Sequence, residues 1–321
     1  MEKSKGVAYC DGNYVPVDKA TIPILDPAFT KSDVVFDAVS VWNNQFFRLE
    51  DHLARFRASC KYVRMNLPLS ENEIKVILAQ CVAQAELTQA VVFMLCTRGR
   101  YGGGVAFGDP RTCRNQFMAY SVPYYWAIPK EHAETGGHLW IAETRRAPNV
   151  AINQRVKNFN RMDLTMAQFE ALDAGADTPL LLSTEGHLTE GPGYNVWIVQ
   201  KHKVYTPSDN LLEGITRLTV FDLCGELNLI AKAMDLSPED LIEADEVFIS
   251  SSAGGILPVT KVNNALIGDG MPGPISSQLG KLYWEKRAQG WHATNVADIL
   301  VKPTLHPANH GHIKAREKIR N

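Results

Sequence analysis

Four short stretches of this sequence hold residue types that can carry out chemistry as well as pack. In the first, residues 155–161, Lys157 has apolar neighbours and an arginine on each side. A lysine that is partly removed from water and close to other cations has a lowered pKa, as an amine that forms a Schiff base requires. The alternative is a solvated lysine on a basic loop, which is the more common case for such spacing.

The second stretch is a turn in which Glu190 begins a Glu-Gly-Pro-Gly sequence ahead of the apolar strand 194–199. A carboxylate between two apolar strands is difficult to explain by packing, and glycines at such a turn let a ligand approach the backbone closely. The alternative is a β-hairpin whose glutamate points to water.

The third and fourth stretches are candidate phosphate sites. Gly214-Ile215-Thr216 leads from a glycine turn into a helix N-terminus, where free backbone N–H groups and a hydroxyl suit a phosphate. Residues 250–255 place serines and glycines directly after a strand, which is a second phosphate cradle. An ordinary helix cap and a flexible turn are the alternatives. Neither stretch contains Gly-Lys-Ser/Thr, so the sequence excludes a P-loop NTPase.

Other site patterns are incomplete. The Gly-rich run 102–108 leads into an Asp-Pro pair instead of a helix, which argues against a dinucleotide fingerprint. His306, His310 and His312 match no closed zinc set, so we expect no metal site. No Gly-x-Ser-x-Gly elbow marks a serine hydrolase.

The composition is that of an ordinary globular protein. The 321 residues carry 33 Lys and Arg against 35 Asp and Glu, a balance that does not indicate nucleic acid or an anionic membrane as a partner. No apolar run approaches the roughly 18 residues of a membrane span, and no secretory signal is recognisable. The six cysteines show no CxxC spacing. We therefore expect a cytoplasmic protein with small-molecule partners.

The elements that must position the four stretches alternate between strands and helices. Residues 40–48 predict a hairpin that turns at Asn43-Asn44, residues 49–65 predict a helix, and a capping box at Ser70 opens the next helix. Further strands are expected at residues 91–96, 116–122, 139–143, 179–183, 194–199 and 246–250, and further helices at 163–174, 216–227 and 275–289.

This order indicates an α+β or mixed α/β fold in two domains. We expect an N-terminal α/β domain over residues 1–122 and an interdomain linker over 123–132, where prolines bound an aromatic segment. The C-terminal α/β domain would cover 133–302 and carry Lys157. The tail 303–321 lacks periodicity and is expected to be loose.

In this order and spacing, the four stretches resemble the class IV aminotransferases, the fold type IV family of pyridoxal-phosphate enzymes. The strongest matches are Leu188–Asn195, Gly214–Arg217 and Ala244–Ile249, and the resemblance extends over nearly the whole chain. The combination is specific although each piece alone is weak, so it replaces the structural alternatives above. It implies a two-domain fold like that of D-amino-acid and branched-chain aminotransferases, with the cofactor between the domains of a homodimer.

The resemblance implies a role for the polar residues of the first two stretches. Lys157 matches the lysine that forms the internal aldimine and then moves the proton between the substrate Cα and the cofactor C4′. Glu190 matches the carboxylate that keeps the pyridine nitrogen protonated, so that the ring can accept the carbanion's electrons. Asn195 resembles a supporting residue of the same turn.

The resemblance also implies a phosphate site, in agreement with the glycine and serine stretches. Arg55 matches the family's phosphate-binding arginine, a task that bidentate charge-assisted hydrogen bonds suit. Ile215 and Thr216 would supply backbone N–H groups and a hydroxyl. Ser251 and Ser252 belong to the same set, and Ser252 stands where relatives often have threonine.

Within the family, several segments resemble the (R)-selective amine transaminases most. The chain departs from those enzymes at Lys31, where they have histidine, at Phe36, where they have tyrosine, and at Arg161, where a tryptophan-glycine pair begins. Arg161 either anchors a substrate carboxylate, which favours amino acids over simple amines, or it points to solvent or braces its loop. Four arginines flank the Gly-rich loop, where those enzymes place a mobile arginine that binds the keto-acid carboxylate, and Arg100 and Arg111 are the candidates for this role. The candidate pocket residues are Lys31, Phe36, Arg100, Arg111, Arg161 and Ala253.

The resemblance thus implies a pyridoxal 5'-phosphate-dependent transaminase with a ping-pong mechanism. We expect it to move an amino group from an amine, first of all an (R)-amine, to a 2-oxo acid such as pyruvate through the Lys157 aldimine. A branched-chain or D-amino-acid aminotransferase is the alternative of the same reaction class. An aminodeoxychorismate-lyase-like enzyme, which releases pyruvate without an acceptor, and a catalytically inactive homologue are the others, and intact Lys157 and Glu190 argue against inactivity.

Overall fold

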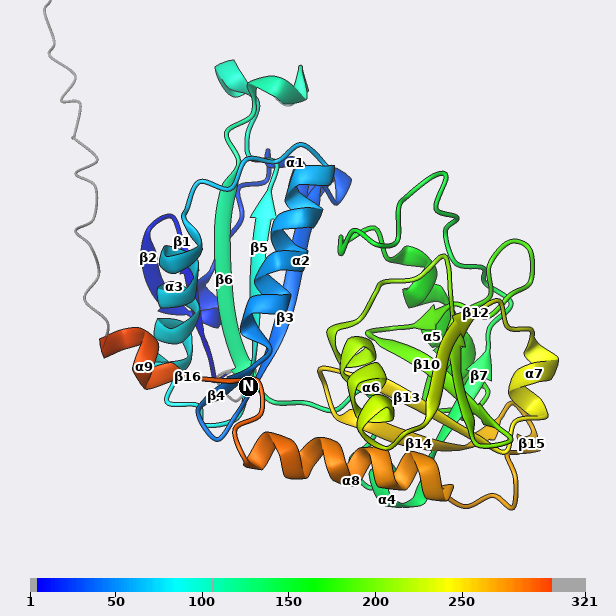
Figure 1. The fold of residues 1–321 in the computed structure, drawn as a ribbon. Helices are drawn as coiled ribbons and strands as arrows, with labels where there is room; N and C mark the ends of the chain where they lie inside the picture. Colours follow the sequence, from blue (N-terminus) through cyan, green and yellow to red (C-terminus); the bar gives the residue numbers. More distant parts are fainter. Residues whose placement is uncertain (1–4, 106, 302–321) are drawn as a thin grey trace, which may run out of the picture.

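The protein folds into two lobes that lie side by side, each built around one β-sheet (Figure 1). The structure is a computed structural model that describes residues 5–105 and 107–301. The sheet of the N-terminal lobe has the strand order β16-β4-β3-β5-β6-β1-β2, with antiparallel pairing throughout. Its strands are β1 (Val7–Cys10), β2 (Asn13–Pro16), β3 (Val34–Trp42), β4 (Gln45–Phe47), β5 (Ala90–Thr97), β6 (Gln116–Pro123) and β16 (Ala293–Asn295).

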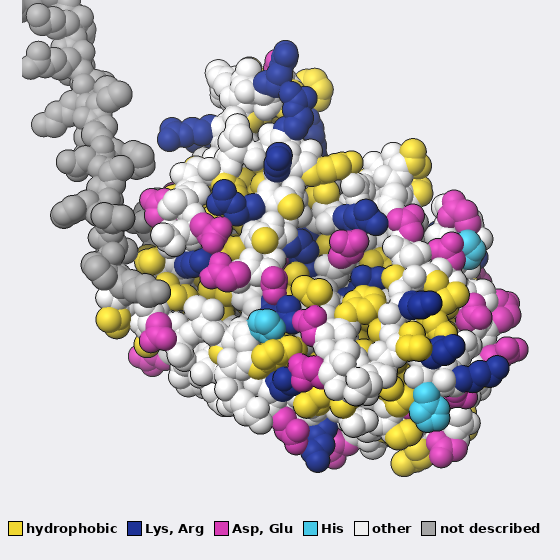
Figure 2. Space-filling model, viewed as in Figure 1, with side chains coloured by type: hydrophobic (Ala, Val, Ile, Leu, Met, Phe, Trp, Pro, Cys, Tyr) yellow, Lys and Arg dark blue, Asp and Glu magenta, His cyan; other side chains and the backbone are white. Residues whose placement is uncertain are grey.

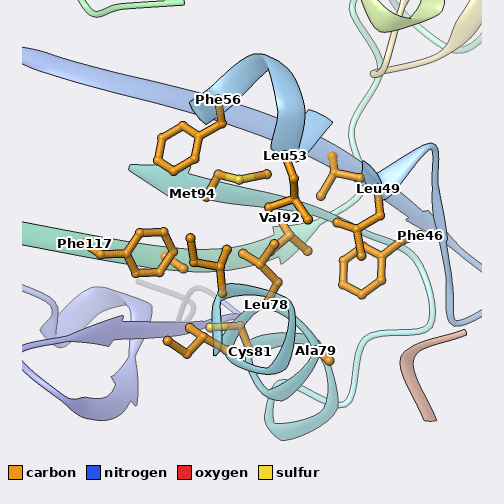
Figure 3. Close-up of a cluster of buried hydrophobic side chains, with 14 of the residues drawn as sticks. Phe46, Leu49, Leu53, Phe56, Leu78, Ala79, Cys81, Val92, Met94 and Phe117 are labelled. Atoms are coloured by element: carbon orange, nitrogen blue, oxygen red, sulfur yellow. The ribbon is translucent and has the colours of Figure 1, made fainter. Parts of the chain in front are cut away.

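Helices α2 (Leu49–Tyr62) and α3 (Glu71–Gln84) cover one face of this sheet. Leu53 and Phe56 of α2 are fully buried there against alternate residues of β3 and β5 (Figure 3). Burial of each such side chain contributes roughly 1.5–3 kcal/mol. Phe36 of β3 belongs to a separate cluster, because successive strand residues point to opposite faces. The core therefore fixes α2 and leaves Phe36 free to face another part of the chain.

Two local predictions for this lobe are confirmed. Asn43 and Asn44 both have positive φ, 49° and 58°, at the turn between β3 and β4, as a tight hairpin requires. The capping box at Ser70 is formed, since its N–H donates to Glu73 Oε2 over 2.8 Å while its own hydroxyl accepts from the Glu73 N–H.

The C-terminal lobe contains a larger mixed sheet of order β12-β11-β10-β13-β14-β7-β8, with β15 on β14 and β9 on β10. Its strands are β7 (Gly137–Ile141), β8 (Thr178–Leu180), β9 (Glu190–Gly191), β10 (Tyr194–Gln200), β11 (Lys203–Pro207), β12 (Ile230–Met234), β13 (Glu246–Ser251), β14 (Gly255–Val262) and β15 (Ala265–Leu266). The helices of the lobe are α4 (His132–Thr135), α5 (Met162–Asp173), α6 (Ile215–Glu226), α7 (Pro238–Ile242) and α8 (Pro274–Ala288).

Apolar clusters lie on both faces of this second sheet. Helices α6 and α8 bury Val220 and Tyr283 against Trp197 of β10, which is fully buried. The other face packs Leu139 and Val196 into a cluster that α7 helps to close. Burial on both faces holds the ends of β9, β10 and β13 rigidly, and the second and fourth sequence stretches lie at these ends.

In the fourth stretch, residues 250–255, the structure differs from the predicted elements. Ser250 and Ser251 end β13, and the chain turns back at once into β14, whose residue Gly255 pairs with Ser251. The sequence did not indicate β14, because Gly254 and Gly255 resemble a loop and Pro258 is unusual inside a strand. The stretch is therefore the tip of a hairpin in a rigid sheet.

A second difference lies near the end of the described chain. Strand β16 pairs with β4, and α9 (Val296–Val301) packs on α3, with Val296 in the core of the N-terminal lobe. Residues 293–301 thus return to the N-terminal sheet, although they fall within the expected 133–302 domain. Such a return is set by long-range strand pairing that no local pattern encodes. The division at 123–132 stays a prediction.

Two of the sequence predictions concern residues that the structure does not describe. The histidines at 306, 310 and 312 and the tail 303–321 lie outside the described residues. Within the described ranges, no helix is both long and apolar enough to cross a membrane. Short helical turns complete the N-terminal lobe at Val17–Lys19, α1 (Pro27–Lys31), Gly102–Gly104 and Pro110–Thr112.

Candidate active site

One cavity brings all four chemical stretches together at the junction of the two lobes. Arg55 enters it from the N-terminal lobe, and the other lining residues come from the C-terminal lobe. Figure 2 shows Lys and Arg side chains along the hollow between the lobes. The cavity is lined by Arg55, Lys157, Arg161, Glu190, Gly193, Tyr194, Asn195, Leu212, Gly214, Ile215, Thr216, Ser250, Ser251 and Ser252.

The backbone at Lys157 is held against the free edge of β3. The Phe36 N–H donates to the Lys157 carbonyl over 3.0 Å, and Val35 and Asn158 form an isolated antiparallel bridge. The lysine Nζ lies 4.7 Å from the centre of the Phe36 ring. Burial, followed by the nearby charges of Arg161 and Arg55, lowers the pKa of Lys157 to about 7. A large fraction of this amine is therefore neutral and nucleophilic near pH 7.

Arg55 is fixed by a buried acid beneath it. Its Nε and Nη2 donate to the two carboxylate oxygens of Asp37, each over 2.8 Å, and Nη1 donates to the Glu213 carbonyl over 3.0 Å. His52 Nδ1 also lies 2.8 Å from Asp37. Burial alone would raise the pKa of Asp37, but the Arg55 charge and the His52 hydrogen bond outweigh it and hold that pKa below its usual range. Arg55 thus faces the cavity in one orientation.

The start of α6 lies opposite Arg55. No side chain caps this helix at Gly214, so its first N–H groups remain for a ligand. A Cβ at Gly214 would lie 2.2 Å from Asn195 Oδ1, which explains why glycine is required there. Asn195 in turn donates through Nδ2 to the Leu212 carbonyl over 2.9 Å. Thr216 is almost fully buried at the cavity wall.

The serines of the hairpin tip have different surroundings. Ser250 Oγ accepts from the Trp197 indole, and Ser251 Oγ donates to the Gly193 carbonyl over 2.8 Å and accepts from the Ala253 N–H. The Ser252 carbonyl accepts from Tyr124, whereas no hydrogen bond of its hydroxyl occurs within the described chain. Ser252 therefore has the hydroxyl most available to a ligand, and Ala253 lies beside it on the same tip.

Glu190 is buried and doubly held. Arg146 donates from Nε and Nη2 to its Oε1 over 3.2 and 3.0 Å, and the Leu212 N–H donates to Oε2 over 3.0 Å. Arg146 also bonds Asp163 at the start of α5. Arg146 was not predicted, because its only local sign is a pair of arginines shortly after an apolar strand. The hairpin expected as the alternative for Glu190 exists, but the carboxylate points into the cavity.

The candidate pocket residues divide into two groups. Arg161 lines the cavity, and Phe36 lies behind it, with the centre of its ring 5.3 Å from the Arg161 guanidinium carbon. Lys31 does not line the cavity, because its Nζ donates to the Tyr101 hydroxyl over 2.8 Å on the neighbouring loop.

The two loop arginines also lie outside the cavity of their own chain. Arg111 is 79% exposed and bonded to Asp109, and Arg100 is exposed. Both belong to the segment between β5 and β6, which projects away from the lobes (Figure 1). A hydrophilic loop without a packed core of its own follows no periodic pattern, so its direction could not be read from the sequence.

Comparison with known proteins finds relatives along most of the chain. Residues 34–262 match the family described as "Amino-transferase class IV". A putative branched-chain-amino-acid aminotransferase of Methanocaldococcus jannaschii is 28% identical over 284 residues, which cover 88% of this chain and 96% of that protein. A D-alanine aminotransferase of Bacillus licheniformis is 28% identical over 271 residues, covering 84% and 93%. The solved structure of a branched-chain amino acid aminotransferase from T.th. with pyridoxamine 5'-phosphate matches with a TM-score of 0.84 at 27% identity, covering 92% of this chain and 100% of that one.

Proposed function

The chain belongs to the class IV aminotransferase family, with the fold of the fold type IV enzymes and pyridoxal phosphate as its cofactor, and we propose that it transfers amino groups from α-amino acids to 2-oxo acids. The observation that carries this proposal is that Lys157, with a pKa of about 7, shares one cavity with Glu190 and Arg55. The names of the relatives, which are branched-chain-amino-acid and D-alanine aminotransferases, support amino acids as donors.

The chemistry of the cavity residues fits pyridoxal phosphate. Arg55, the first N–H groups of α6 and the Ser252 hydroxyl would hold its phosphate. Glu190 would face the ring nitrogen, and Lys157 would bind the aldehyde. Because Gly214 has no side chain, the turn before α6 can pack against Asn195, which also lines the cavity.

Each of these residues has a task in the transfer. Bound pyridoxal phosphate supplies a carbon that takes up the amino group and a ring that accepts electrons from the substrate Cα. Lys157 would remove and return the Cα proton, which its pKa of about 7 allows near neutral pH. Glu190, whose position Arg146 and the Leu212 N–H fix, would place a negative charge against the ring nitrogen. Arg55 would keep the cofactor oriented during both half-reactions.

An (R)-amine donor is the second candidate. Phe36 and Phe159, with ring centres 4.6 Å apart, form an aromatic wall beside Lys157 that suits an apolar amine. The sequence favoured an (R)-amine as the donor. We now place amino acids first, because the relatives found by comparison bear the names of amino-acid aminotransferases. The lyase-like alternative gains no support from those names.

A spectroscopic half-reaction tests the choice of donor. Holoenzyme is mixed in parallel with D-alanine, L-leucine, (R)-1-phenylethylamine and its S enantiomer, without an acceptor. The proposal predicts that the visible band of lysine-bound cofactor fades with at least one amino acid. Fading with the (R)-amine alone would contradict it and favour the second candidate.

We further propose that the enzyme is a homodimer. Met162, Met166 and Phe169 form an apolar stripe on α5, and they are 74%, 49% and 59% exposed. Their spacing places them on one face of the helix, and an exposed apolar face of this kind is typical of an interaction surface. Light scattering after gel filtration should give twice the chain mass, and Met166→Lys should shift the equilibrium toward the monomer. A monomeric wild type would contradict the proposal.

A cytoplasmic location is also proposed. All six cysteines lack disulfide partners, and four of them are buried in the lobes. Free buried thiols are usual in a reducing compartment. Fractionation of cells that express the natural gene would test this location, and recovery of the protein from an oxidising compartment would contradict it.

A further inference from the structure

Arg161 differs from Arg55 and Arg146 because no acid or carbonyl of the described residues is bonded to its guanidinium. Arg55 is bonded to Asp37 and to the Glu213 carbonyl, and Arg146 is bonded to Glu190 and Asp163. Within the described ranges, the Arg161 guanidinium makes no hydrogen bond or ion pair, although it is partly buried and lines the cavity.

This arrangement costs free energy unless a ligand completes it. Burial lowers the pKa of Arg161, the direction expected when a cation loses water without gaining an anion. Of the acids whose charges act on Arg161, Glu190 has the larger effect and Asp163 the smaller. Arg146 and the Leu212 N–H already occupy the two oxygens of Glu190, and Asp163 accepts from Arg146. A bracing role would require hydrogen bonds from the guanidinium to its own loop, and there are none within the described chain. The donors of Arg161 are therefore directed at something that enters the cavity.

The position of Arg161 identifies the part of the ligand that it would meet. Its guanidinium carbon lies 5.3 Å from the centre of the Phe36 ring, and Lys157 Nζ lies 4.7 Å from the same centre. Both residues line the same cavity, and the charge of Arg161 acts on the Lys157 amine, so a group held at Lys157 comes close to the guanidinium. The phosphate is expected elsewhere, between Arg55 and the start of α6. A planar fork of N–H donors matches a carboxylate in charge and shape.

We propose that Arg161 binds the α-carboxylate of the amino-acid donor and of the 2-oxo-acid acceptor, an inference that rests on the proposed transaminase function. It makes Arg161 the residue that selects acids over simple amines. The same cation would serve both half-reactions, because donor and acceptor carry the carboxylate next to the reacting carbon.

Matched substrates with and without the carboxylate test the proposal. Wild-type and Arg161→Gln holoenzymes are assayed with three matched pairs. Two are donor pairs, L-leucine with 3-methylbutylamine and D-alanine with ethylamine. The third is an acceptor pair, pyruvate with acetaldehyde. The ratio of kcat/KM for the acid over its carboxylate-free partner should fall about 10- to 100-fold in the variant, the value of one hydrogen-bonded ion pair. Arg161→Lys should recover part of the ratio. Arg145→Gln, which removes an exposed cation outside the cavity, is the control and should leave the ratio at the wild-type value.

The outcomes separate this inference from the proposed function. An equal loss of kcat/KM for acids and for their partners would overturn the role of Arg161 even if the enzyme transaminates amino acids. A loss of pyridoxal phosphate affinity in Arg161→Gln, with the ratio unchanged, would overturn it in favour of a cofactor contact. If the wild type accepts only amines as donors, the donor part of the proposed function fails. The pyruvate and acetaldehyde pair would then still decide whether Arg161 binds a carboxylate.

Discussion

The two sides of the cavity, which we propose hold the cofactor and the substrate, differ in how their charges are satisfied. On the cofactor side, Arg55 is held by Asp37, and Glu190 is held by Arg146 and the Leu212 N–H. On the substrate side, Arg161 lies over an aromatic ring with no partner in the described chain. Paired charges give fixed geometry, which suits a cofactor that stays bound. An unpaired charge suits a ligand that must bind and leave in every cycle.

The largest effect is expected at the lysine that both sides share. Lys157→Ala should lower the rate of amino transfer by about 10⁴-fold or more, because it removes the covalent attachment and the proton-transfer group together. The rate is measured in single turnovers with preloaded cofactor. A variant within tenfold of the wild type would show that another amine does the chemistry.

Removal of the charge on Glu190 comes next. Glu190→Gln keeps the shape of the side chain but removes the negative charge, so we expect kcat to fall about 100-fold or more. Arg146 keeps its bond to Asp163, which limits the loss of stability. Stopped-flow spectra give kcat, and thermal unfolding gives stability. A large fall in unfolding temperature with kcat unchanged would mean that Glu190 has only a structural role.

Asp37→Asn tests whether the fixed geometry of Arg55 matters. The substitution weakens the bidentate pair that orients Arg55, so the Kd for pyridoxal phosphate should rise about tenfold while kcat at saturating cofactor changes little. Absorbance titration of the apoenzyme measures this Kd. The matched control is Asp51→Asn. Asp51 lies on α2, the helix that carries Arg55, and forms a partly exposed ion pair with Arg48. Equal effects of the two substitutions would show that only helix stability is involved.

The smallest effect expected is a shift in pH dependence. With a pKa of about 7, Lys157 loses its proton as pH rises through 7, so the rate of cofactor capture by the apoenzyme should rise across that range and level off above it. Arg161 is one of the cations that lower this pKa, so Arg161→Gln should move the midpoint to higher pH. A shift to lower pH in the variant would contradict the assigned electrostatics.

Much of the fold was predictable because its signals are local. The Ser70 capping box and the Asn43-Asn44 turn are encoded by adjacent residues, and the structure confirms them. Strand β14 was missed because its glycines and proline resemble a loop. The return of residues 293–301 to the N-terminal sheet was missed because it depends on pairing with β4, far away in the sequence.

The candidate site shows the same limit. Lys157 and Glu190 were singled out from their local sequences and Arg55 from the family resemblance, and the three meet in one cavity. Asp37 and Arg146, which hold two of them, were missed because such partners are defined only when distant elements pack together. Lys31 and Arg111 were assigned to the pocket by resemblance. Lys31 instead donates to Tyr101 of the projecting loop, and Arg111, within that loop, donates to Asp109.

Covalent trapping of the cofactor tests the central claim most directly. Holoenzyme is reduced with borohydride, which makes the bond between cofactor and lysine permanent, and the digested protein is mapped by mass spectrometry. The account predicts the added mass on one peptide only, that containing Lys157. Attachment at Lys31 or at another lysine, or no attachment after saturation with pyridoxal phosphate, would contradict it.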